Sequence, residues 1–332
     1  MNCHFSADKK AMYNRTWAPI MTLIANDMRE RGYTLTKDAN LMWWQEPANI
    51  IPCTPNEDDL VIYTDRSRDH THSTNSLYVG LQGPEAGYFS IDKVGVWPHL
   101  EQTYTKPPVS DVIETNFYFN EAITLLKEGK VNHYNNRHLQ KASDIEQIPD
   151  DHILICVSNI VDTAWNHAWH RFGSCINHII LNSKFPIVVK FDPQLVMSPK
   201  GEVDESRLAG VTDMLNSMDT QRITYFTGLE SLHDILPKTR VTILDENVIN
   251  LEPYMYNKPI ISYGAPPSRH YIKQIYHQHE LIPLLEDLSW FPKDRHWSED
   301  QKPRPYDWLQ WYMGQYLCSD KITVNKRLNQ LL

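Results

Sequence analysis

Short apolar runs alternate with amphipathic stretches in the first half of the chain. Residues 15–32 place apolar side chains at helical spacing, and strand-like runs follow at 59–63 (DLVIY) and 76–81 (SLYVGL). Helix-like sequence returns at 115–128. The alternation predicts an α/β domain with a parallel sheet. The apolar positions of the first predicted helix are Trp17, Ile20, Met21, Leu23, Ile24 and Met28.

A second α/β block begins at His152. Its buried strand, HILICVS, is followed by a helix at 172–183, a strand at 185–190 and a helix near 204–218. Residues 222–264 then read as strand, helix, strand, helix and strand with very short connections. Such a unit builds a nucleotide-binding crevice at the carboxyl ends of parallel strands.

The polar stretch 130–150 is typical of a connection between domains. The aromatic-rich tail from Tyr306 predicts an amphipathic helix that crosses back to the first domain. We therefore expect two Rossmann-like domains, at 1–145 and 146–305, followed by C-terminal helices at 306–332. Two such domains would face each other across a ligand cleft.

Composition and charge narrow the class of protein. The chain has 332 residues, which is long for one domain, and a net charge of −9, which gives no general attraction to nucleic acid or anionic membranes. Five dispersed cysteines without CxxC spacing indicate reduced thiols. The polar N-terminus and the lack of a long apolar run predict neither a signal peptide nor a transmembrane segment. We expect a cytoplasmic protein, and the sequence leaves its oligomeric state open.

The first candidate for chemistry is QGPEAGYFSIDKVGV, residues 82–96. Gly83 and Pro84 predict a turn directly after a strand, which places Glu85 near the carboxyl end of that strand. Either Glu85 or Asp92 could take a proton from an acceptor hydroxyl. The competing interpretation is a solvated turn residue for Glu85 and a capping residue for Asp92.

Polar residues also follow the predicted strands of the second block. Asn159 and Asp162 come after the strand that starts at His152, where open sheets bind phosphates and substrates. A helix N-cap is the equally simple alternative. Lys190 ends the next strand and could pair with a phosphate as a point charge, or lie in solvent, and Asp192 stands in the turn after it.

The last α/β unit carries its own candidates. Asp245, Glu246 and Asn247 lie between a strand and a helix, whose free backbone N–H groups would favour a phosphate or diphosphate. Glu252 is expected roughly one and a half turns into that helix, within the uncertainty of helix starts. A carboxylate at this position can reach a ribose.

Several common site types are absent from the sequence. It has no Walker A, GxGxxG, HExxH or GxSxG motif, which argues against the usual dehydrogenases, NTPases and hydrolases. We expect no metal, because none of the three histidine pairs adds a third ligand at recognisable spacing. These pairs are His70 and His72, His167 and His170, and His277 and His279.

Four segments, taken in order, resemble one family, the capsule polysaccharide biosynthesis proteins or Kdo-transferase-like glycosyltransferases. EAGYFSIDKVGV resembles the family's E-x-G-Y…D/E-x-x-G-V segment, and ILICVSNIVDTA its second-domain opening strand. PIVVKFDPQ resembles the V-V-K-P-H-P strand and turn. VTILDENVINLEPYMYNKPIISYG resembles the donor-site signature that ends in G-K-P-V-I-x-x-G. These pieces span about residues 78–264.

The resemblance implies a GT-B fold, an acceptor in the N-terminal domain and a nucleotide sugar in the C-terminal domain. It implies metal-independent sugar transfer to a hydroxyl without a cofactor, the nucleotide sugar being a co-substrate. Glu85 becomes the catalytic carboxylate, with Asp92 as the alternative, and Glu252 becomes the ribose contact. The candidate donor-binding residues are Asn159, Asp162, Lys190, Asp192, Glu246, Asn247 and Glu252.

The chain departs from the family pattern in the donor half. Phe191 and Asp192 replace the family's Pro-His, and Glu246-Asn247 replaces Asn-Ser. The histidine that would contact the donor's phosphate or sugar is therefore missing. This departure leaves a nucleoside-diphosphate sugar open as the donor in place of CMP-Kdo.

The acceptor and two rival functions stay open at this point. A surface glycan is the acceptor that the resemblance implies, and a hydroxymethylated base in phage DNA is the alternative. Asp65, Arg66 and Arg68 are the candidate acceptor-binding residues, and the two arginines would supply a basic groove for DNA. The rivals are a nucleotide-sugar 2-epimerase on the same fold and a non-catalytic nucleotide-sugar-binding subunit.

Overall fold

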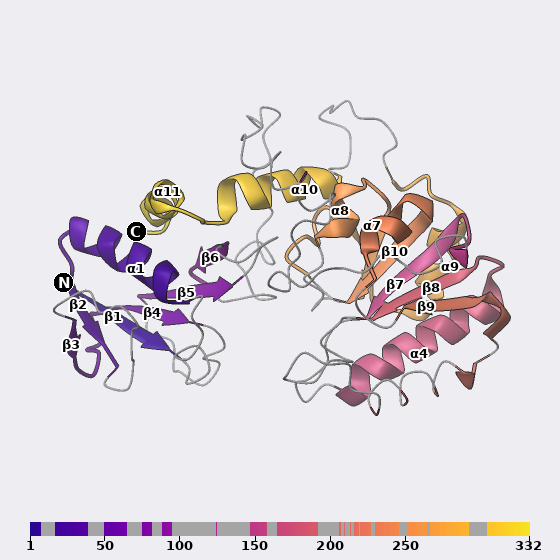
Figure 1. Ribbon diagram of the computed structural model, residues 1–332, viewed down its shortest axis with the longest axis horizontal. Helices are drawn as coiled ribbons and strands as arrows, with labels where there is room; N and C mark the ends of the chain where they lie inside the picture. The colour runs from indigo at the N-terminus through magenta and orange to yellow at the C-terminus, as the bar shows by residue number, and fades with distance from the viewer. Residues whose placement is uncertain are drawn as a thin grey trace. The chain divides into compact units, whose positions relative to one another are not determined.

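Two sheets of six strands each carry the described part of the chain (Figure 1). The computed structural model describes residues 1–7, 17–38, 50–64, 75–81, 88–94, 124, 147–157, 165–191, 206, 209, 213, 216–218, 220–226, 230–245, 251–263, 266–291 and 304–332. The predicted helix at 115–128 and the connection at 130–150 fall largely outside these residues. The strands alternate with helices, so the expected α/β class is confirmed.

The first sheet has the strand order β3-β2-β1-β4-β5-β6. Its parallel strands are β1 (Asn2–Ala7), β2 (Thr34–Lys37), β3 (Ile51–Pro52), β4 (Leu60–Thr64) and β5 (Ser76–Leu81). The last strand, β6 (Phe89–Asp92), runs antiparallel to β5, which corrects the expectation of a purely parallel sheet. The reason is length, because parallel neighbours need a crossover of a dozen or more residues and only residues 82–88 join these two strands.

Helices α1 (Trp17–Glu30) and α11 (Lys321–Leu331) cover one face of this sheet (Figure 1). Alternate strand residues such as Phe5 and Ile62 point into this core, where α1 contributes Ile24 and α11 contributes Leu328. The predicted first helix is thereby confirmed. Its polar residue Asp27 is buried and accepts a hydrogen bond from Asn325 of α11 at 2.8 Å.

The second sheet is parallel throughout and has the order β12-β11-β10-β7-β8-β9. Its central strands are fully buried, as the continuous apolar runs predicted. The strands are β7 (His152–Val157), β8 (Ile187–Phe191), β9 (Ile223–Phe226), β10 (Thr239–Asp245), β11 (Ile260–Tyr263) and β12 (Lys273–Ile275).

Helices cover both faces of the second sheet (Figure 1). On one face, α4 (Trp165–Asn182) and α9 (Leu281–Glu286) pack against the apolar side chains of β7, β8 and β10. On the other face lie α7 (Leu232–Ile235) and α8 (Glu252–Met255). Helix α4 begins seven residues before the predicted start at 172, within the stretch WNHAWH. Short 3₁₀ turns complete the unit at Thr220–Arg222, Leu236–Lys238 and Gln278–Glu280.

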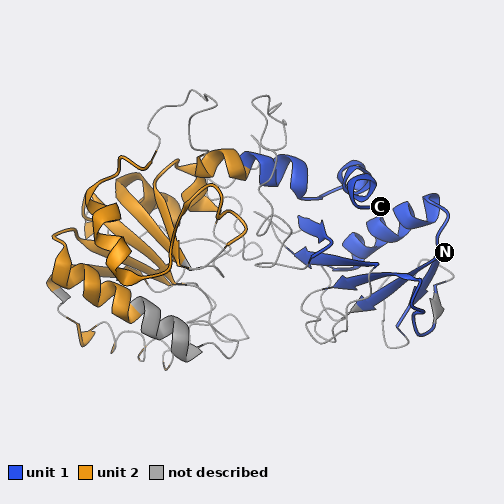
Figure 2. Ribbon diagram, turned by 180° about the vertical axis from the view of Figure 1, so that it is seen from behind, with its two compact units in different colours: residues 1–107, 133–135, 310–332 blue, residues 108–132, 136–309 orange. Residues whose placement is uncertain are grey.

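The chain divides into two compact units (Figure 2). Unit 1 comprises Met1–Pro107, His133–Asn135 and Gln310–Leu332, and unit 2 comprises Pro108–Asn132 and Asn136–Leu309. The C-terminal segment thus returns to the N-terminal unit. None of the helices in the described part of the chain is long and apolar enough to span a bilayer.

The returning tail is more irregular than the single amphipathic helix that its sequence predicted. Helix α10 (Pro305–Trp311) passes into a π-helical turn at Tyr312–Tyr316, where the Leu317 N–H donates to the Tyr312 carbonyl at 2.9 Å. A backbone bridge then joins Cys318 to Phe89 of β6, and α11 follows. Asp320 caps α11 by accepting a hydrogen bond from the Thr323 N–H at 2.8 Å.

His152, at the start of β7, predicts a pH dependence of stability. Its ring is buried, with Nδ1 2.7 Å from the Pro149 carbonyl and Nε2 2.9 Å from Thr239 Oγ1. Burial lowers its pKa, and the nearby Lys258 and Lys238 act in the same direction. The unfolded chain therefore binds this proton first, so stability is lost as the pH falls below about 6.5, by up to about 1.4 kcal/mol per pH unit.

We expect His152→Gln to lose less unfolding free energy than the wild type between about pH 7.5 and pH 5.5. Urea denaturation at the two pH values measures this difference. His279→Gln removes an exposed ring of the same unit and should keep the wild-type response. Equal pH responses in His152→Gln and wild type would contradict the assignment.

Candidate functional site

The order of strands reverses in the middle of the unit 2 sheet. From β7 the chain builds β8 and β9 on one side, and then returns to build β10, β11 and β12 on the other. The helices that follow β7 and β10, α4 and α8, lie on opposite faces of the sheet, and ligands bind outside the carboxyl ends of such strands. In this unit the rule points to the ends of β7 and β10, whose last residues are Val157 and Asp245.

Lys190 lies at this edge, on β8 beside Cys156 of β7. The sequence left open whether this lysine is solvated, and the structure shows a side chain that is only 5% exposed. Its ammonium Nζ donates to the Phe191 carbonyl at 2.9 Å. A buried ammonium must be compensated, and this hydrogen bond uses one of its three donors.

Glu252 is the first residue of α8, a four-residue helix on the same side of the sheet as the carboxyl end of β10. The expectation that Glu252 lies one and a half turns into the helix was therefore wrong, because the helix begins at Glu252 itself. A carboxylate in the first turn complements the positive end of the helix dipole, which favours this position for an acidic side chain. The side chain is half-buried.

Tyr254 anchors α8 to distant parts of unit 2. Its ring is fully buried, its hydroxyl lies 2.7 Å from Ser268 Oγ, and its ring centroid lies 4.9 Å from that of Trp308. Burial raises the pKa of Tyr254 above its usual range, so the hydroxyl keeps its proton and can donate a hydrogen bond. Nothing in the local sequence pattern distinguished this anchor, because both of its partners are distant in the chain.

Tyr256 joins α8 to α7. Its hydroxyl lies 3.0 Å from His233 Nδ1, and the two rings are 5.8 Å apart. Burial, followed by the charges of Asp234 and Glu252, raises the pKa of Tyr256. The Tyr256–His233 contact therefore ties α7 and α8 together on this face of the sheet.

Asp92, the second predicted catalytic carboxylate, lies in unit 1 and is fully buried at the end of β6. It accepts a short hydrogen bond from the Tyr316 hydroxyl and another from the Val94 N–H at 2.6 Å. Arg327 of α11 stands 3.9 Å away, donates to the Ile91 carbonyl, and lies 4.5 Å over the Tyr316 ring. These contacts fasten the C-terminal tail to β6, which favours a structural role, because a proton acceptor must reach its substrate.

The remaining site predictions fall outside the described residues. Among the predicted residues that the structure describes, Lys190 lies near the carboxyl end of β8, Glu252 begins α8, and Asp92 contacts the tail in unit 1. The sequence-predicted residues beyond the described ranges are Glu85, Asn159, Asp162, Asp192, Glu246, Asn247, Asp65, Arg66 and Arg68.

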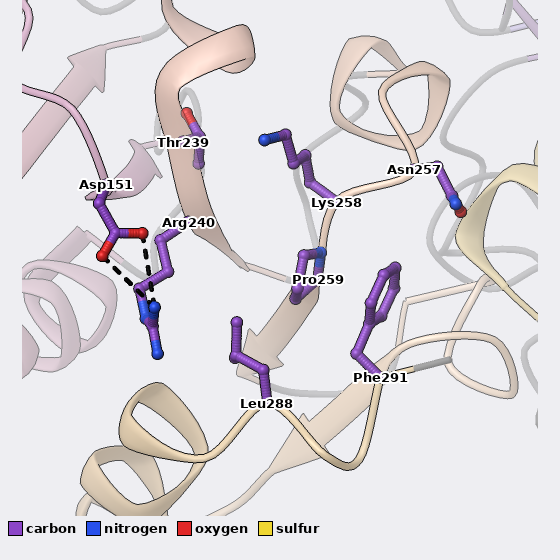
Figure 3. A pocket seen from close by; sticks show the side chains of 8 residues that line it. All are labelled: Asp151, Thr239, Arg240, Asn257, Lys258, Pro259, Leu288 and Phe291. Carbon is purple, nitrogen blue, oxygen red and sulfur yellow. Dashed lines mark hydrogen bonds and ion pairs between the residues drawn. The ribbon is translucent and has the colours of Figure 1, made fainter. Parts of the chain in front are cut away.

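A cavity of about 330 Å³ opens at the opposite, amino-terminal edge of the unit 2 sheet (Figure 3). Arg240 on its wall is already paired with Asp151 at 3.4 Å and donates to two carbonyls of the Leu285–Glu286 segment. Burial lowers the pKa of Lys258, which donates to the Pro237 carbonyl at 3.2 Å. This cavity lies at the wrong end of the strands for the crevice. Its lining residues are Asp151, Thr239, Arg240, Asn257, Lys258, Pro259, Leu288 and Phe291.

Two Rossmann-like units with strands in the order 3-2-1-4-5-6, and a C-terminal segment that returns to the first unit, define the GT-B fold. The fold expected from the sequence is thereby confirmed. Among solved structures, the chain is similar to the β-Kdo 2,4 transferase of Thermosulfurimonas dismutans KpsC. The TM-score is 0.52 at 10% identity, over 92% of this chain and 88% of that one.

Two further solved structures are more distant. The β-Kdo 2,7 transferase of the same KpsC gives a TM-score of 0.48 at 9% identity over all of both chains. UDP-GlcNAc 2-epimerase of Methanocaldococcus jannaschii gives 0.39 at 10% identity, over 100% of this chain and 99% of that one. No protein-family model and no curated protein sequence matches the chain.

The contacts of Asp92 predict that Tyr316→Phe destabilises the protein. The variant removes the hydroxyl that donates to a fully buried carboxylate, which costs about 1–3 kcal/mol of unfolding free energy. Urea denaturation measures the change. Lys321→Ala is the matched control on the same tail, because the exposed Lys321–Glu30 pair should contribute nothing measurable. A wild-type midpoint for Tyr316→Phe would show that the buried hydrogen bond does not hold the tail.

Proposed function

We propose that the chain is a glycosyltransferase that moves a sugar from a nucleotide-sugar donor to an acceptor hydroxyl. The observation that carries the proposal is the placement of Glu252, at the start of α8, on the carboxyl side of a parallel sheet with a central reversal of strand order. That edge is where open α/β sheets bind nucleotides. The likeness in fold to a solved Kdo transferase supports this assignment.

Glu252 is proposed to accept hydrogen bonds from the ribose hydroxyls of the donor. Tyr254, anchored on Ser268 and Trp308, keeps the start of α8 fixed, so the carboxylate is positioned before the nucleotide arrives. Preorganisation of this kind reduces the entropy lost on binding. Lys190, with its ammonium at the carboxyl end of β8, is proposed to stabilise the phosphate that departs with the nucleotide.

The remaining roles rest on the sequence alone. Asn159, Asp162, Asp192, Glu246 and Asn247 are proposed to complete the donor site in the loops that follow the strands. Glu85 is proposed as the carboxylate that takes the proton of the acceptor hydroxyl. Unit 1 is proposed to bind the acceptor, and Asp92 to serve mainly in fastening the tail.

Nucleotide binding is the first test. We expect a nucleoside mono- or diphosphate from a panel of UDP, CMP, GDP and ADP to raise the thermal unfolding midpoint, because a ligand that binds only the folded state stabilises it. For the nucleotide selected, Glu252→Gln should weaken binding about ten- to a hundredfold, the usual worth of hydrogen bonds to a charged group. Isothermal titration calorimetry measures both dissociation constants.

A ribose analogue makes this test specific. The 2′,3′-dideoxy form of the selected nucleotide should bind the wild type more weakly, and Glu252→Gln should cause no further loss with that analogue. Glu286→Gln, an exposed carboxylate change on α9, should bind both forms like the wild type. If no nucleotide binds the wild type, the proposed function is wrong.

Turnover assays distinguish sugar transfer from the two rival functions, epimerisation and binding without catalysis. Glu85→Gln should keep donor affinity while release of nucleotide from the donor falls about a hundredfold or more, the usual contribution of a general base. An epimerase would convert the donor sugar without any acceptor, and a binding subunit would release no nucleotide. Product analysis with and without added glycosides decides among the three, and undiminished turnover in Glu85→Gln would remove Glu85 from the mechanism.

A further inference from the structure

A fully buried histidine lies in β1, the central strand of unit 1. His4 Nδ1 is 3.0 Å from Thr36 Oγ1 on β2, and His4 Nε2 is 3.0 Å from Asp38 Oδ1. Ser6, two residues along β1, donates from its hydroxyl to Asp38 Oδ2 at 2.7 Å. The two oxygens of one carboxylate are therefore each held by a side chain of the same strand.

The network stands at the carboxyl edge of the unit 1 sheet. Asp38 follows β2 directly, and its N–H donates to the Phe5 carbonyl at 3.1 Å, so its backbone continues the pairing with β1. The order of strands reverses between β1 and β4 in this sheet, as it does between β7 and β10 in unit 2. By the same rule, ligands of unit 1 should bind outside the ends of β1 and β4.

The geometry shows which group the network presents. The Asp38 side chain is 40% exposed, whereas His4 is fully buried and Ser6 nearly so. Ser6 and His4 contact separate oxygens of Asp38 and not each other, so the serine is not set up as a nucleophile, which would require a base at its hydroxyl. A neutral imidazole with its hydrogen on Nε2 satisfies every contact, by donating to Asp38 and accepting from Thr36.

This arrangement is costly for a purely structural role. A buried imidazole must be hydrogen-bonded at both nitrogens to offset its loss of water, and an apolar side chain would fill the same space without that requirement. Val61, the register partner of His4 on the neighbouring β4, is a buried apolar residue at the corresponding position. What the polar network adds is a carboxylate fixed in direction yet open to solvent, as preorganised binding groups are.

Two tyrosines lie on the neighbouring strands, and Tyr63 of β4 pairs in register with Ser6 of β1. Tyr63 on β4 stacks on Tyr78 of β5 with ring centroids 5.5 Å apart and an interplanar angle of 22°. Tyr63 and Tyr78 are each only 8% exposed, so they form a buried aromatic support on the β4 side of Ser6, and burial raises the pKa of Tyr63. A carboxylate that is fixed in direction and 40% exposed suits a saccharide, because it accepts hydrogen bonds from the hydroxyl groups that sugars carry.

We propose that Asp38 is a sugar-binding carboxylate at the carboxyl edge of unit 1, which orients the hydroxyl groups of a saccharide acceptor, with His4 and Ser6 as its positioning residues. A carboxylate accepts about four hydrogen bonds, so two anchoring donors are compatible with a bound hydroxyl. A saccharide is thereby named as the acceptor class. Its role as acceptor rests on the transferase function proposed above. Binding of a saccharide at Asp38 can be measured independently of any donor.

The imidazole of His4 supplies the reporter for this test. Protein labelled with ¹³C and ¹⁵N in histidine is titrated with a panel of methyl glycosides, and His4→Gln identifies the His4 signals among the fifteen histidines. We expect a glycoside to shift the His4 signals with a saturable dependence on concentration. Asp38→Asn should weaken that binding about ten- to a hundredfold, and Ser6→Ala should weaken it by a smaller factor.

Asp27→Asn is the matched control. Asp27 is a buried, hydrogen-bonded carboxylate of the same unit, on the helix α1 that covers the other face of the sheet. This variant should keep the wild-type affinity for the glycoside even where it lowers stability. Asp38→Asn should also bind the selected nucleotide like the wild type, because that site belongs to unit 2.

The outcomes separate the two proposals. Absence of a His4 shift with every glycoside, or equal affinities in Asp38→Asn and wild type, would overturn the role of Asp38 whatever the nucleotide does. Saccharide binding that depends on Asp38 in a protein that binds no nucleotide would keep the sugar site and reject the transferase. A loss of affinity in Asp27→Asn as large as in Asp38→Asn would show that the effect comes from destabilisation of unit 1, and would also overturn the proposal.

Discussion

Parallel strands pair through their backbones and bury both faces under helices, and this constraint determines where the protein can bind anything. In unit 2, α4 and α9 close one face of the sheet and α7 and α8 lie on the other, so the ends of the strands are where a ligand can approach the sheet. The reversal of strand order between β7 and β10 then selects one place along the carboxyl edge. Lys190 lies one residue before the end of β8, and Glu252 begins the helix that follows β10 in the chain.

The same constraint explains how much the sequence could predict. Strands such as β7 and β8 are buried on both faces and appear in the sequence as unbroken apolar runs. Their positions, and the parallel pairing in unit 2, could therefore be predicted from the pattern of apolar runs alternating with helices. The strand β1 could not, because its sequence NCHFSA alternates apolar residues with His4 and Ser6. Those polar residues are accommodated by Thr36 and Asp38, more than thirty positions away, and no local pattern contains that information.

The candidate site shows the same division between local and distant causes. Glu252 could be identified from its segment, but its position at the first residue of α8 could not, since the helix is held by Tyr254 against Ser268 and Trp308. The sequence offered Asp92 either as a proton acceptor or as a capping residue, and its local pattern contained no sign of what surrounds it. Its surroundings are instead supplied by Tyr316 and Arg327, from the far end of the chain. The other predicted site residues lie outside the described ranges, so their roles remain predictions.

The return of the tail to unit 1 has a consequence for the order of events during synthesis. Unit 2 is inserted between the N-terminal and C-terminal segments of unit 1, and the core of unit 1 includes Val324, Leu328 and Leu331 from α11. Domains fold on the ribosome as their residues emerge. The unit whose sequence begins first is therefore the one completed last, and until α11 arrives the nascent chain carries an N-terminal sheet with part of one face uncovered, a surface that a chaperone would recognise.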